Sequence, residues 1–112
     1  MGERADDAKY MKTRAHYFRR DGTPIEDVLE WGRLFGDLDY RFVAQDTLPN
    51  GRWVATIWEG LNQAVMPDEP PLIFETTVFS QKKPLGHELE QHHSATEAEA
   101  LLVHRQMTEK WK

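Results

Sequence analysis

Two segments near the middle of the chain constrain the fold most, because both are rich in β-branched and aromatic residues. The first spans residues 51–60 and the second spans residues 70–79, with a proline-containing loop between them. Residues of this kind favour strands, and a sheet with such strands needs helices or a partner to cover it. The two segments therefore predict an α+β fold built on an antiparallel sheet.

Composition narrows the class of protein. The chain has 112 residues, which fits one domain with one modest core. It has no cysteine, which excludes disulfides, cysteine-ligated zinc and thiol catalysis and suits a reducing cytoplasm. A net charge of -5 argues against a general nucleic-acid binder, and no apolar run is long enough to span a membrane. The sequence shows no secretory signal, phosphate loop or cofactor motif, so we expect a cytoplasmic protein without a cofactor.

Turn and capping residues place the first elements. Residues 1–15 are polar and without periodicity, which predicts a mobile tail before a single domain over residues 16–112. We expect a short strand over residues 16–20, followed by a turn at Asp21-Gly22. Thr23 and Glu26 then have the spacing of a capping box, which predicts the start of a helix that ends near residue 35. Gly32 lies inside this helix and predicts a close approach to the sheet.

The rest of the chain reads as strands followed by a helix. The strands are expected over residues 40–46, 52–59 and 72–80, with a shorter one over residues 87–93. Thr96 and Glu99 have the spacing of a capping box and predict the start of the last helix. We expect an antiparallel β-meander of three to five strands, with two helices packed on one face.

Several short motifs in this order resemble those of a known family. They are Tyr17-Phe18, Asp21-Gly22, Pro24-Ile25, Glu30-Trp31, Leu34-Phe35, Asp39-Tyr40-Arg41, Gly60-Leu61-Asn62, Pro70-Pro71-Leu72-Ile73-Phe74-Glu75-Thr76, Thr96-Glu97 and Glu99-Ala100-Leu101. Together they are similar to a family of short, functionally uncharacterised proteins of phages, prophages and bacterial hosts, many of them actinobacterial. The resemblance covers roughly residues 16–108 and implies an accessory gene of a virus or mobile element, without catalytic residues or a cofactor. This chain differs from the family in its amino-terminal tail and at Gln63, where relatives often have histidine.

Two glutamates are the candidate acids. Glu75 lies in the middle of a predicted strand, where it is either a ligand-binding acid or the partner of Arg41 or Arg52 in an ion pair; we favour the ion pair. Glu59 ends the strand before it and could join Glu75 as a carboxylate pair for hydrolysis. No third group, glycine-rich loop or metal motif in the sequence supports that chemistry.

The histidines are candidate metal ligands. His87, His92 or His93 could join His104 in a zinc site without cysteine. His104 lies on the apolar stripe of the last helix, where a histidine is more often a core residue bonded to a backbone carbonyl. We therefore expect no metal site.

The tryptophans point to a binding surface. Trp53 and Trp58 lie on opposite faces of the predicted strand, so one is expected under the helices and the other on the open face. Exposed tryptophan with arginine and tyrosine nearby is typical of an interface hot spot. The binding residues that we expect are Arg41, Arg52, Trp58, Asn62 and Glu75.

These observations favour a non-enzymatic, phage- or prophage-encoded protein that binds a host or phage protein in the host cytoplasm. Host takeover or counter-defence would be a typical role. One alternative is a minor virion or assembly protein that forms a homodimer through the open sheet face. Another is a ligand-sequestering protein or hydrolase that uses Glu75, Glu59 or His104.

Overall fold

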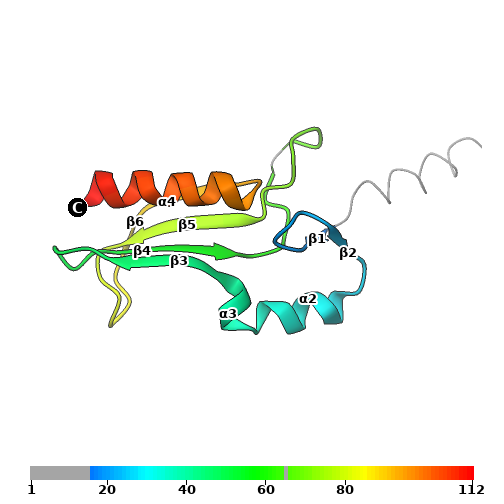
Figure 1. Ribbon diagram of the computed structural model, residues 1–112, viewed down its shortest axis with the longest axis horizontal. Coiled ribbons are helices and arrows are strands. Elements are labelled where there is room, and N and C mark those ends of the chain that lie inside the picture. Colours follow the sequence, from blue (N-terminus) through cyan, green and yellow to red (C-terminus); the bar gives the residue numbers. More distant parts are fainter. Residues whose placement is uncertain (1–15, 65) are drawn as a thin grey trace, which may run out of the picture.

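A four-stranded antiparallel sheet forms the centre of the protein (Figure 1). The computed structural model describes residues 16–64 and 66–112, so the tail predicted over residues 1–15 lies outside the described residues. The strands follow one another in the order β3, β4, β5, β6. Their bounds are Phe42–Thr47, Trp53–Trp58, Phe74–Phe79 and Glu88–Ser94. The predicted α+β fold with an antiparallel meander is confirmed.

A small hairpin precedes this sheet. Strands β1 (Tyr17–Phe18) and β2 (Pro24–Ile25) pair around the predicted turn, in which Gly22 has a φ of 91°. Glycine takes this conformation without steric cost. The backbone N–H of Phe18 donates to Gly60 O at 2.8 Å, which attaches the hairpin to the end of β4.

The last helix, α4 (Glu97–Trp111), lies along one face of the sheet (Figure 1). It begins as predicted: the Thr96 side chain accepts a hydrogen bond of 3.1 Å from the Glu99 N–H. Its buried residues Ala100, His104 and Met107 face the sheet. We call the covered side the helix face; strands β4 and β5 contribute to it Val54, Thr56, Trp58, Phe74, Thr76 and Val78, all of them buried.

The first helix differs from the prediction in its start. Helix α2 (Val28–Phe35) is capped by Asp27, whose side chain accepts from the Leu29 N–H, and Thr23 is instead held by Asp21 in the turn. Pro24–Ile25 is therefore strand β2 and not the first turn of a helix. A short helix α3 (Leu38–Arg41) also replaces the start of the predicted strand, because the Asp37 side chain accepts from the N–H groups of Asp39 and Tyr40.

The expectation that two helices pack on one face of the sheet is wrong. Helices α2 and α3 lie on the side opposite α4 and extend beyond the end of the sheet (Figure 1). Helix α2 contacts α3 and the β1–β2 hairpin, and α3 contacts β3 and β4. The expected close approach of Gly32 to the sheet is wrong, since this glycine is exposed and an added Cβ would meet nothing within 4 Å.

Among residues 16–64 and 66–112, no helix is both long enough and apolar enough to cross a membrane.

Candidate binding site on the open sheet face

The sheet face opposite α4 carries the candidate site, and we call it the open face. Because side chains alternate along a strand, the odd-numbered residues of β4 and β5 point to this side. The register places Trp53 opposite Phe79, Ala55 opposite Thr77 and Ile57 opposite Glu75. These residues form two adjacent rows across the middle of the sheet.

A hollow of about 150 Å³ lies on this face. One end of it is aromatic: the rings of Trp53 and Phe79 stack with centroids 5.4 Å apart, and the ring of Phe42 is 6.4 Å from that of Trp53. The buried residues Ala55 and Thr77 lie between the ends. The residues lining the hollow are Arg41, Phe42, Trp53, Ala55, Ile57, Glu75, Thr77 and Phe79.

The other end of the hollow is charged. The Glu75 carboxylate accepts a hydrogen bond of 3.0 Å from the Thr77 hydroxyl, and His93 Nε2 is 3.7 Å from it. The expected ion pair of Glu75 with Arg41 or Arg52 is not found among the described residues. Arg41 instead lies over the Phe35 ring at 3.8 Å, and its buried Nε has no hydrogen-bond partner in the described part of the chain.

Glu59 lies beside Glu75 on the same face. Burial raises the pKa of Glu59 to about 8, and the neighbouring Glu75 carboxylate adds to the shift through a hydrogen bond and through charge repulsion. Arg41 and a hydrogen bond of 3.2 Å from the Gln63 amide oppose the shift. Glu59 therefore keeps its proton at neutral pH.

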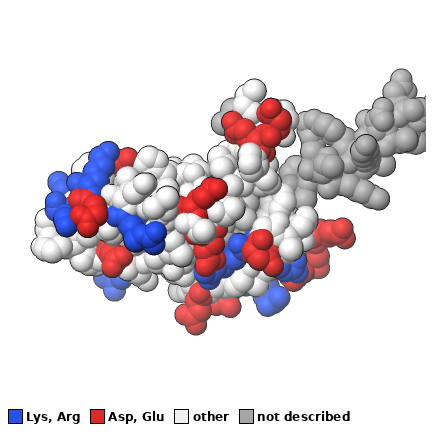
Figure 2. All heavy atoms as spheres, turned by 45° about the horizontal axis from the view of Figure 1, so that its top comes forward, with Lys and Arg blue, Asp and Glu red and all other residues white. Residues whose placement is uncertain are grey.

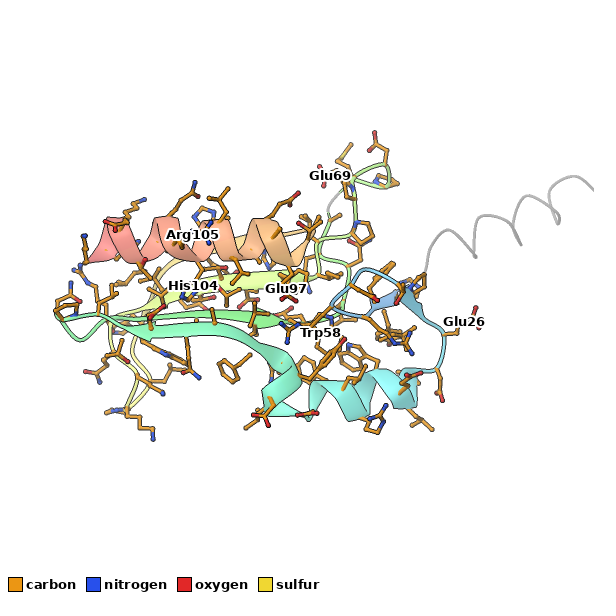
Figure 3. The ribbon with its side chains drawn as sticks, in the orientation of Figure 1. Glu26, Trp58, Glu69, Glu97, His104 and Arg105 are labelled. Atoms are coloured by element: carbon orange, nitrogen blue, oxygen red, sulfur yellow. The ribbon has the colours of Figure 1, made fainter. Side chains whose placement is uncertain are left out.

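The expected exposure of Trp58 is wrong. Its side chain is 0 % exposed, and its indole N–H donates to Phe18 O at 2.8 Å. Tyr40 packs edge-on against the ring, and a Cβ at Gly60 would overlap it. Figure 3 shows Trp58 at the end of the sheet nearest α2. Trp58 is thus a core residue, and Trp53 is the tryptophan of the open face.

Two other predicted binding residues lie away from the hollow and have structural partners. Arg52 donates to the backbone oxygen of Trp111 at 3.0 Å and lies over the Trp111 ring, at the end of α4. The Asn62 side chain accepts from the N–H groups of Ala64 and Leu72, at 2.8 and 3.2 Å, and so holds the loop between β4 and β5. Of the five predicted residues, only Arg41 and Glu75 line the hollow.

Phe42, Ile57 and Phe79 were not expected at the site from sequence, and Trp53 had no assigned role. The partial signal for Trp53 is Glu75, because a mid-strand glutamate is easiest to accommodate on a face that no helix covers. The register that places Ile57 opposite Glu75, and so puts Trp53 on the same face, is seen only in the structure.

His104 belongs to a separate network under α4. Its Nε2 lies 2.6 Å from Asp46 Oδ2, and its Nδ1 lies 2.8 Å from Thr56 Oγ1, which lies 2.8 Å from Thr76 Oγ1. The expected bond to a backbone carbonyl is therefore wrong. Figure 3 shows His104 pointing from α4 toward the sheet.

Across residues 16–64 and 66–112, no three histidine, aspartate or glutamate side chains are close enough to hold a metal ion. Comparisons with protein families, with curated proteins and with solved structures found no match to this chain.

Proposed function

We propose that this chain is a non-enzymatic binding protein that captures a protein partner on its open face. The observation that carries the proposal is the hollow, which joins a cluster of three aromatic rings to a charged end on a face that α4 does not cover. Large aromatic residues and arginine beside a pocket are the usual composition of an interface hot spot. In this proposal Trp53, Arg41 and Glu75 are the binding residues.

The size of the hollow favours a protein partner over a small molecule. Pockets for cofactors and drug-sized ligands enclose roughly 300–1,000 Å³. A hollow of about 150 Å³ holds one large side chain. A shallow sheet face with one such hollow suits a partner that inserts a single anchor residue and covers the surroundings.

The context of the proposal comes from the resemblance to phage and prophage proteins. A small accessory protein of this kind would act in the host cytoplasm on a host or phage protein, in host takeover or counter-defence.

The surface charge is uneven: Figure 2 shows basic side chains where α4 ends and acidic side chains on the loop between β4 and β5. Lys110 and Lys112 are exposed at the first place, and Asp68 and Glu69 at the second.

The geometry gives less support to a hydrolase. Glu75 lies close enough to Glu59 to raise its pKa, whereas glycoside hydrolysis needs two carboxyl groups at least about 5 Å apart. His104 cannot assist them, because it lies on the helix face with Asp46 and Thr56. In the described residues these groups form two separate clusters on opposite sides of the sheet.

Comparative capture tests the proposal. Tagged wild-type protein, Trp53→Ala and Leu102→Ala are each exposed to an actinobacterial lysate, and bound proteins are quantified by mass spectrometry. Leu102 is exposed on α4 and serves as the matched control. We expect Trp53→Ala to lose a partner that wild type and Leu102→Ala retain, while its circular dichroism is unchanged. Equal recovery of every protein by all three would refute the proposal.

A further inference from the structure

We propose that the hollow on the open face receives a basic side chain, a lysine or arginine of the partner protein, whose stem lies along Ala55 and Ile57 and whose charged end meets Glu75. This inference rests on the proposed function and specifies the chemistry of the partner's anchor residue. It follows from three features of the described residues: the shape of the hollow, the balance of charge at its polar end and the position of its aromatic rings.

The hollow matches an amphipathic side chain. Ala55 and Ile57 provide an apolar floor between the two ends, along which an alkyl stem can lie. Glu75 lines the polar end and has Glu59 beside it. Lysine and arginine carry a long apolar stem with a charged tip, so they bury the stem on such a surface and direct the tip to a carboxylate.

The aromatic end already holds a cation of the same kind. Lys82 Nζ lies 5.3 Å from the centre of the Trp53 ring and 3.3 Å from Gln45 Oε1. Lys82 is an exposed side chain, so a partner can displace it. Tryptophan attracts cations through the negative face of its ring, which favours a basic stem passing over Trp53.

Charge balance explains why a cation would be drawn to the polar end. Burial and the neighbouring Glu75 carboxylate both disfavour the ionised form of Glu59, and Arg41 opposes them only in part. An incoming ammonium or guanidinium adds a positive charge beside the two glutamates and so allows the Glu59 proton to leave.

The groups facing Glu59 define the pH dependence. They are Glu75 of β5 and Arg41 of α3, with the neutral Gln63 of the loop, while His93 of β6 faces Glu75. Binding of a cation should release about one proton at pH 7. The dissociation constant should then rise about tenfold for each unit by which pH falls below 8, because the ligand competes with the proton.

The test uses small probes on the whole protein. N-acetyl-lysine methylamide and N-acetyl-arginine methylamide are titrated at pH 6, 7 and 8, and the Trp53 indole N–H is followed by NMR after assignment with Trp53→Phe. N-acetyl-norleucine methylamide is the neutral control of matched shape. Ligands of this size bind with a dissociation constant on the order of 1 mM. We expect saturable shifts with the two basic probes, weaker binding at pH 6, and little shift with the norleucine probe.

Two variants assign the pH effect. Glu59→Gln keeps the size and hydrogen bonding of the side chain but removes its titration, so the basic probes should bind it with a nearly constant affinity from pH 6 to 8. His93→Gln should keep the wild-type pH dependence. Equal binding of all three probes, no binding of the basic probes, or tighter binding at pH 6 than at pH 8 in wild type would each overturn the inference.

Failure of the inference is distinguishable from failure of the proposed function. If Trp53→Ala loses its partner from the lysate but the basic probes do not bind, the open face is an interface with a different anchor. If capture is unchanged by Trp53→Ala, the proposed function fails whatever the probes do.

Discussion

At the scale of single residues, Trp53 and Trp58 differ in role although they lie on the same strand. Trp58 is fully buried, hydrogen-bonded to Phe18 and packed by Tyr40. Trp53 is half-buried on the open face, where it forms one end of the hollow. Alternation along β4 directs the Trp58 ring into the core and the Trp53 ring to the open face.

The first prediction compares these two residues. Trp58→Ala should lower the free energy of unfolding by about 3–5 kcal/mol, the usual cost of removing a large aromatic side chain from a core. Trp53→Ala should cost only about 1 kcal/mol, since much of that ring already faces solvent. Urea denaturation followed by circular dichroism measures both. Equal losses would mean that the ring of Trp53 is also part of the core.

The second prediction concerns Glu59. Its pKa is raised from 4.5 to about 8, so the folded protein holds a proton that the unfolded chain releases above 4.5. The unfolded state therefore binds fewer protons than the folded state between pH 4.5 and 8, and stability falls as pH rises through that range. Relative to Glu59→Gln, wild type should become less stable from pH 5 to pH 8.5 in urea denaturation. A constant difference between the two proteins across this range would exclude the raised pKa.

At the scale of secondary-structure elements, helix α2 contains Gly32, a glycine whose position in the helix would also accept alanine. Gly32 is exposed, and an added Cβ would meet nothing within 4 Å. Gly32→Ala should raise the free energy of unfolding by about 0.5–1 kcal/mol, because alanine restricts the unfolded chain and favours the helix. Thermal unfolding measures the change in stability. The stability of Gly32→Ala is compared with that of Gly36→Ala, at the end of the same helix. A destabilised Gly32→Ala would mean that another part of the molecule packs on this side of α2.

The buried polar network ties α4 to the sheet. Thr56 is 0 % exposed and bonds both His104 and Thr76. Thr56→Val keeps the shape but leaves both partners without this hydroxyl, which should cost about 1–3 kcal/mol. Thr47→Val, at an exposed position of β3, should change stability by less than about 0.5 kcal/mol. Denaturant unfolding at pH 7 compares the two, and similar values would show that the network contributes little.

Elements governed by local signals were predictable from sequence, whereas those that depend on competition or on distant packing were not. Strands β4 and β5 follow from β-prone residues, and Thr96 marks the start of α4. The start of α2 was misplaced because Thr23 and Asp27 are both good caps and only the β1–β2 pairing decides between them. The open tryptophan was misassigned because alternation separates Trp53 from Trp58 but only the docking of α4 decides which face is covered.

At the scale of the whole molecule, the proposed function predicts a monomer that binds a different protein. The chain carries a net charge of -5, and the repulsion between like-charged copies opposes self-association. We expect a monomer at tens of micromolar by size-exclusion chromatography with light scattering. A stable dimer that Trp53→Ala dissociates would instead support the assembly alternative, with a second copy on the open face.

The central claim is that the open face, and not α4, contacts the partner. A photo-crosslinking amino acid at Gln45, which is exposed and lies beside Trp53, can be compared with the same group at Leu102 on α4. After irradiation in cells, we expect a discrete crosslinked product from position 45, lost with Trp53→Ala, and no such product from position 102. A product from position 102 alone would place the partner on the opposite side of the protein and contradict the proposed function.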